Sequence, residues 1–112
     1  MESTRQQKIA RLIQKDLGMI FQQESRNLFS GAMITVTKVN VAKDLSVAKS
    51  YISLFGVKDK EGMMDNIRHH TRDIRRKLGL LEHNQLRIIP ELQFFLDDSL
   101  DYIEKIDNLL KS

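Results

Sequence analysis

Apolar residues recur along the chain with two different periods, and these periods predict the order of its secondary-structure elements. Spacings of three and four residues near the start indicate an amphipathic helix. Its apolar stripe comprises Ile9, Leu12, Ile13, Leu17, Ile20 and Phe21. Ser3 and Gln6 fit a capping box, in which each side chain bonds the other's backbone N–H, so we expect the helix to begin there.

Two segments after a turn-like stretch at residues 27–31 predict a β-hairpin. Residues 33–41, MITVTKVNV, are rich in β-branched side chains. Their alternation changes parity midway, which indicates either a bulge near Thr37 or apolar neighbours on both faces. Residues 46–55 alternate more regularly. Because only residues 42–45 join the two segments, we expect them to pair antiparallel.

A third strand is predicted in the run QLRIIPELQFFLDDS, residues 85–99. Every second residue from Leu86 to Leu96 is apolar, which is typical of a half-buried strand. A simple apolar linker would not explain six alternating positions. Pro90 has no N–H to give to a central ladder, so we place this strand at an edge of the sheet or at a bulge.

The remaining segments predict helices. Residues 63–81 place four aliphatic side chains on one side of a helix, and we expect Gly79 to end it. Residues 98–110 predict a short acidic helix, with Asp97 and Asp98 at its start, where carboxylates cap free N–H groups. The order helix, strand, strand, helix, strand, helix indicates an α+β sandwich of two layers.

Composition narrows the class of protein. A chain of 112 residues is expected to form one domain, and the absence of cysteine excludes disulfides and thiolate metal sites. We find no signal peptide and no apolar run long enough to cross a bilayer, so we expect a monomeric cytoplasmic protein without membrane association.

Candidate catalytic chemistry is sparse. The five glycines are isolated, so no phosphate-binding loop is predicted. His69 and His70 are adjacent, and neighbouring helical residues point about 100° apart, so they do not chelate a metal as an i, i+4 pair does. Capping is a simpler role than acid–base catalysis for Asp97 and Asp98. We therefore expect no catalytic residue, no metal site, no cofactor and no enzymatic activity.

Charge is distributed unevenly. Residues 1–91 contain 16 Lys/Arg and 10 Asp/Glu, a net charge of +6, whereas residues 92–112 have a net charge of −3. A basic body suits a polyanionic partner, although many soluble proteins are mildly basic. The candidate phosphate-binding residues are Arg68, Arg72, Arg75, Arg76 and Lys77 on the second helical region, Lys8, Arg11 and Lys15 on the flank of the first helix, and Lys43 and Lys49 in the hairpin.

The four arginines are the strongest of these signals. On a helical wheel they occupy an arc of about 100°, away from the apolar stripe. Like charges at i, i+4, such as Arg68 and Arg72, are mildly destabilising, which favours a functional reason for them. The alternative is a solvated face that Asp65 and Asp73 partly neutralise.

Three segments together resemble the bacterial ribosome-binding factor A family. They are the hairpin VTKVNVAKDLSVAKSYISLFG at residues 36–56, the helix IRRKLG at residues 74–79, and the strand LRIIPELQFFLDDS at residues 86–99. The resemblance covers nearly the whole chain. It implies a type II K-homology (KH) fold at residues 1–97, followed by a tail at residues 98–112, and a factor that binds the immature small (30S) ribosomal subunit and its 16S rRNA to assist late maturation and rRNA processing.

The resemblance also implies that the second helical region is two helices meeting at a kink. Classical KH domains carry a GxxG loop there, and this family carries a shorter Ala-x-Gly. Here the residues are His70, Thr71 and Arg72, so clamping of a single strand by a GxxG loop is not expected, whereas a cationic helical face that contacts the rRNA backbone is. The alternative function is a protein-interaction module with an acidic partner and only incidental RNA contact.

Overall fold

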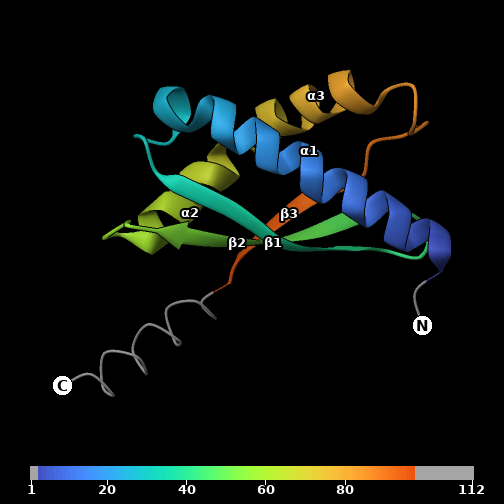
Figure 1. Ribbon diagram of the computed structural model, residues 1–112, viewed down its shortest axis with the longest axis horizontal. Helices are drawn as coiled ribbons and strands as arrows, with labels where there is room; N and C mark the ends of the chain where they lie inside the picture. The colour runs from blue at the N-terminus through green and yellow to red at the C-terminus, as the bar shows by residue number, and fades with distance from the viewer. Residues whose placement is uncertain (1–2, 98–112) are drawn as a thin grey trace, which may run out of the picture.

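The computed structural model describes residues 3–97 and confirms a two-layer α+β fold (Figure 1). The elements are α1 (Thr4–Leu28), β1 (Met33–Val41), β2 (Val47–Phe55), α2 (Lys60–His69), α3 (Thr71–Glu82) and β3 (Glu91–Leu96). The three helices lie on one face of a sheet whose strand order is β1-β2-β3. The helix expected at residues 98–110, with its cap at Asp98, lies outside the described residues.

Helix α1 begins with the predicted capping box. The Ser3 hydroxyl accepts a hydrogen bond from the Gln6 N–H at 3.1 Å, and the Gln6 side-chain carbonyl accepts one from the Ser3 N–H at 2.9 Å. Ile13 and Leu17 are fully buried beneath the helix. The chain leaves the helix through Gly31, whose φ of 77° is open to glycine without steric cost.

The hairpin is antiparallel and has the predicted bulge. Its register passes from Val36 opposite Ile52 directly to Lys38 opposite Tyr51, so Thr37 has no partner in the ladder. The extra residue reverses the parity of the strand, and Val36, Val39 and Val41 all become buried. The bulge therefore explains the irregular alternation of apolar residues in this strand.

The second helical region is two helices, and the break lies at His70. The His70 N–H still bonds the carbonyls of Asn66 and Ile67, at 3.2 and 3.1 Å, but α3 starts in a new direction at Thr71. The His70 ring packs edge-on against Phe29, with centroids 5.9 Å apart. The kink is thus present without Ala-x-Gly, and the His70 backbone, with φ −98° and ψ 12°, departs from helical values at the break.

Three expected boundaries are wrong. The second helical region begins at Lys60 rather than at residue 63. Helix α3 does not end at Gly79 but continues to Glu82; Gly79 lies inside the helix and faces Ile89. Strand β3 starts at Glu91 rather than Leu86, and Ile88 is 73% exposed, so the alternation before Pro90 is not that of a strand. Pairing with β2 begins directly after Pro90, which has no N–H to donate: the Glu91 N–H bonds the Ser46 carbonyl at 2.9 Å.

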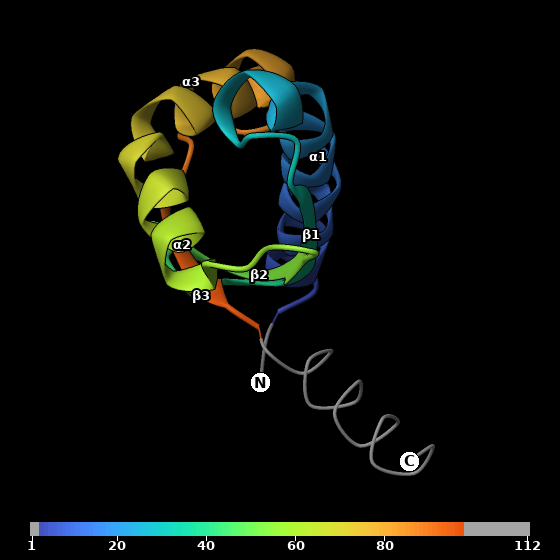
Figure 2. The same ribbon diagram turned by 90° about the vertical axis from the view of Figure 1, so that its left-hand side faces the viewer.

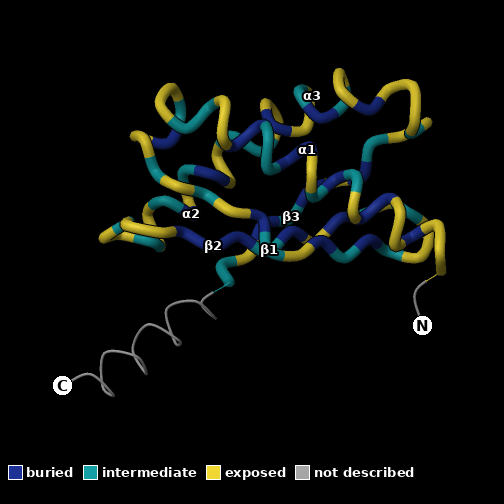
Figure 3. Tube along the Cα trace, viewed as in Figure 1, coloured by how far each residue is buried: buried dark blue, intermediate teal, exposed yellow. Residues whose placement is uncertain are grey.

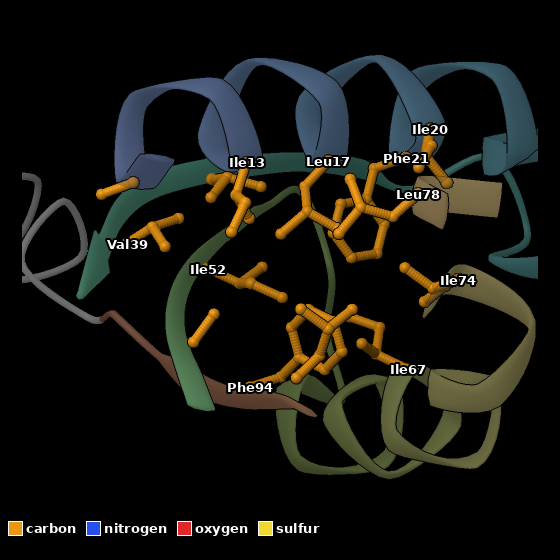
Figure 4. Packing of buried hydrophobic residues seen from close by; sticks show 14 of the residues in the cluster. Ile13, Leu17, Ile20, Phe21, Val39, Ile52, Ile67, Ile74, Leu78 and Phe94 are labelled. Atoms are coloured by element: carbon orange, nitrogen blue, oxygen red, sulfur yellow. The ribbon is translucent and has the colours of Figure 1, made fainter. Parts of the chain in front are cut away.

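Strand β3 is nevertheless at an edge of the sheet, as Pro90 predicted, and it runs parallel to β2. The core lies between the helices and the inner face of the sheet (Figures 3 and 4). At its centre the Phe21 ring contacts Phe29 and Phe94, with centroid distances of 5.6 and 5.9 Å. No described helix covers the opposite face of the sheet, as Figure 2 shows.

Candidate nucleic-acid interface

The cations of α1 form one stripe along its solvent-facing side. Lys8, Arg11 and Lys15 are exposed, as the sequence predicted. Arg26 was not predicted, yet it belongs to the stripe, because 18 residues after Lys8 is five full turns at about 100° per residue. Within residues 3–97, none of these four side chains has a hydrogen-bond or ion-pair partner. We call these four residues the α1 stripe.

The acidic residues of α1 do not neutralise the stripe, because they face α3 instead. The Glu24 carboxylate lies 2.6 Å from the Lys77 ammonium, and this hydrogen bond lowers the pKa of Glu24. Asp16 is 7% exposed and lies against Glu82 of α3. Among residues 3–97, no carboxylate pairs with the cations on the outward side of the helix, and such positive charge attracts polyanions over several ångströms.

Part of the α1 stripe opens onto a groove between α1 and β1. Arg11, Lys15 and Arg26 line this groove, and Gln22 and Thr35 add polar side chains to it. Amides and hydroxyls beside cations can hydrogen-bond phosphate and sugar oxygens of a nucleic-acid backbone. The groove therefore offers both charge and hydrogen-bond partners to such a backbone.

The arginines of α2 and α3 were expected to form a cationic face open to phosphates. In the structure, two of them bind the protein's own backbone. Arg68 donates to the Phe94 carbonyl from two guanidinium nitrogens, at 3.3 and 3.0 Å. Arg75 donates to the carbonyls of Pro90 and Ile89, at 3.1 and 2.6 Å. Both guanidinium groups hold the outer edge of β3 and the segment that leads into it.

The other predicted cations of this region are mostly paired as well. Arg76 lies 3.6 Å from Asp73, and Arg68 lies 3.8 Å from Asp65, which are the neutralising contacts considered above. Lys77 is bound to Glu24 and is not simply solvated. Only Arg72 among the predicted residues of α2 and α3 lacks a partner within the described chain. Most cations of this face therefore have a partner within the described chain, although Arg68, Arg75 and Arg76 remain exposed.

The two helical groups of cations lie at opposite edges of the sheet. The groove beside Arg11 includes residues of β1, whereas Arg72 and Arg75 line a hollow with Ile89, which leads into β3. Lys43 is exposed in the hairpin turn, and Lys49 is exposed on the uncovered face of β2. The sequence-predicted residues therefore do not form one continuous surface.

Other kinds of site have little support in the described residues. Residues 3–97 contain no group of three His, Cys, Asp or Glu side chains that could hold a metal ion. Asp97 accepts a hydrogen bond from the Thr37 hydroxyl at 2.6 Å, so it secures the bulge. Among the described helices, none has the length and apolarity needed to cross a membrane.

A sequence profile described as ribosome-binding factor A matches residues 5–110. The chain belongs to the ribosome-binding factor A family. Curated relatives in this family include the ribosome-binding factors A of Cytophaga hutchinsonii and Flavobacterium johnsoniae. The first is 47% identical over 98% of this chain and 83% of its own length. The second is 49% identical over 98% of this chain and 85% of its own length.

Structures of ribosome-binding factor A from other bacteria share the fold. The Thermus thermophilus crystal structure superposes with a TM-score of 0.67 at 21% identity, covering 81% of this chain and 94% of that one. The Thermotoga maritima solution structure superposes with a TM-score of 0.63 at 22% identity and covers 85% of this chain and 89% of that one. A homology model of the Thermus thermophilus factor, fitted into a cryo-EM map of a 30S complex, gives a TM-score of 0.62 at 24% identity and covers 80% of this chain and 91% of that one. The expected KH-like fold is confirmed.

Proposed function

We propose that this member of the family binds the immature small ribosomal subunit in the cytoplasm, through phosphates of its 16S rRNA. There it assists late maturation and rRNA processing without catalysing a reaction itself. The observation that carries the proposal is the α1 stripe, whose four cations have no partner within residues 3–97. The fitted 30S complex of the Thermus thermophilus relative supports the choice of partner.

The physical basis is the release of counterions. Each lysine or arginine that contacts a phosphate releases a condensed cation, so affinity falls steeply as salt rises. An unpaired cation gives this full effect, whereas one already paired with a carboxylate must first lose that partner. The α1 stripe is therefore the principal contact in this proposal. Arg72 and the fixed guanidinium of Arg75 contribute at the other edge of the sheet.

Co-sedimentation tests the proposal. Tagged protein from lysate is run on a sucrose gradient, and we expect it to travel with free small subunits. The variant Lys8→Glu/Lys15→Glu should bind them at least about ten-fold more weakly. Its log–log salt slope should be smaller by about 0.7–0.9 for each phosphate that the variant no longer neutralises.

A matched control is Lys58→Glu/Arg87→Glu, which changes the net charge equally at two exposed positions away from α1. We expect it to bind nearly as well as the parent. An equal loss of affinity in both variants would mean that net charge alone determines binding. The α1 stripe would then not be the contact. Association that survives ribonuclease treatment of the particles would favour an acidic protein partner instead of rRNA.

A further inference from the structure

The sheet face turned away from the helices carries side chains that the α1 stripe does not explain. The strand registers place Lys38, Tyr51 and Phe95 opposite one another, so these three residues form a row across β1, β2 and β3. The neighbouring row on the same face is Asn40, Lys49 and Gln93. One row thus joins a cation to two rings, and the next joins a cation to two amides.

The two rings form an accessible pair. The centroids of Tyr51 and Phe95 are 5.5 Å apart, and the ring planes are inclined by 30°. Phe95 is 37% exposed, and Tyr51 is partly exposed. Both rings belong to neighbouring strands, so the backbone hydrogen bonds of the sheet fix their spacing before any ligand arrives.

The lysines beside the rings are available for a ligand. Lys38 and Lys49 are exposed, and neither has a hydrogen-bond or ion-pair partner within the described chain. Together with Asn40, Val47 and Tyr51 they line a shallow hollow on this face. Two acidic residues border this face: Glu91 lies at the far end of β3 from Phe95, and Asp97, two residues after Phe95, accepts a hydrogen bond from the Thr37 hydroxyl at 2.6 Å.

We propose that this sheet face binds an unpaired segment of RNA. Bases stack on Tyr51 and Phe95, the ammonium groups of Lys38 and Lys49 contact the flanking phosphates, and the amides of Asn40 and Gln93 bond base edges. Base–aromatic stacking needs a base outside a duplex, and exposed rings among cations are the features that single-strand-binding surfaces combine. The site lies on the face of the sheet opposite the helices, so it is distinct from the α1 stripe. It rests on the proposed function for its ligand class and adds selectivity for single strands.

Tyrosine emission provides a direct readout. The chain has two tyrosines and no tryptophan, so Tyr102→Phe leaves Tyr51 as the sole emitter. The probes are an oligouridine of about eight nucleotides and an RNA hairpin with the same total charge. We expect oligouridine to quench Tyr51 in the full-length chain, whereas the hairpin should bind without quenching it.

Matched substitutions separate the rings from general electrostatics. In the parent chain, Phe95→Leu and Tyr51→Leu keep an apolar side chain but remove a ring, and each should weaken oligouridine binding about ten-fold while leaving hairpin binding unchanged. Tyr51→Phe keeps the ring and should bind oligouridine as the parent does. Thermal unfolding of each variant checks that the sheet is intact.

Several outcomes overturn this inference. The inference is wrong if the leucine variants bind oligouridine as tightly as the parent does. Concentration-dependent dimers that Phe95→Leu abolishes, with RNA binding unaffected, would assign the face to a second copy of the chain. A rise in Tyr51 emission on removal of residues 98–112, with no response to oligouridine, would assign it to that acidic segment. If only Lys8→Glu/Lys15→Glu affects RNA, this inference fails and the proposed function stands.

Discussion

The cations of α1 and those of α2 and α3 share residue types and helical spacing, yet they differ in their partners within the described chain. The four cations of the α1 stripe are exposed and have no partner in the described chain. On α2 and α3, Arg68 and Arg75 bind backbone carbonyls, and Arg76 and Lys77 bind carboxylates. A basic helical face therefore indicates a nucleic-acid site only after its internal partners have been accounted for.

The difference arises from the two free edges of the sheet. At the β1 edge, α1 supplies neutral amides: Gln6 donates to the Val41 carbonyl at 3.0 Å, and Gln14 donates to the Val36 carbonyl at 3.1 Å. At the β3 edge, α2 and α3 supply guanidinium groups. Unpaired edge groups invite pairing with other chains, so both edges need cover. Glutamines of α1 cover the β1 edge, and the cations of α1 lie exposed without partners in the described chain.

The strongest test of this comparison measures stability. Arg68→Ala/Arg75→Ala should lower the free energy of unfolding by about 2–3 kcal/mol, since the carbonyls at the β3 edge no longer receive hydrogen bonds from charged donors. The matched α1 variant, Arg11→Ala/Lys15→Ala, should stay within about 0.5 kcal/mol of the parent, as surface substitutions do. Urea unfolding measures both changes, and equal destabilisation of the two variants would contradict the assignment.

A second test examines the contact between the two helices. Burial and the nearby Asp16 carboxyl raise the pKa of Glu82 to about 8. The folded state therefore binds a proton between the ordinary value of about 4.5 and about 8, so stability falls as pH rises across this window. Glu82→Gln removes the titration and keeps the shape of the side chain. At pH 8 its free energy of unfolding should exceed that of the parent by a few kcal/mol, at roughly 1.4 kcal/mol for each unit of the pKa change.

The advantage of Glu82→Gln should disappear near pH 4.5, where the parent is protonated as well. Denaturant unfolding at a series of pH values provides the measurement. A constant difference between the two proteins at every pH would show that the carboxyl group does not titrate in this window.

The smallest expected change in stability comes from Gly79, which lies inside α3, the helix that carries Arg75. A Cβ at Gly79 would lie 3.5 Å from Ile89 Cγ1, an ordinary contact, so Gly79→Ala should stabilise the helix by about 0.5–1 kcal/mol. Gly56→Ala is the contrasting control, because Gly56 has a φ of 73° and alanine is strained there. Destabilisation by Gly79→Ala in thermal unfolding would contradict this expectation.

Local patterns in the sequence were sufficient where the determining interactions are local. The capping box needs only Ser3 and Gln6, and the bulge at Thr37 changes the alternation of its own strand. Helical spacing placed Lys8, Arg11 and Lys15 on one side of α1, and it could have added Arg26, which shares their direction. The family followed from specific segments in the right order.

Contacts between distant segments were decided only by the tertiary structure. Whether an arginine is available depends on what lies opposite it: Arg75 meets carbonyls 14 and 15 residues away along the chain, and Lys77 meets Glu24 on another helix. Helical spacing specifies direction around an axis but not the neighbour in that direction. For the same reason, the row of Lys38, Tyr51 and Phe95 exists only once the strands pair in register. The sequence determined the elements and the family, and packing determined which cations and rings remain available for a partner.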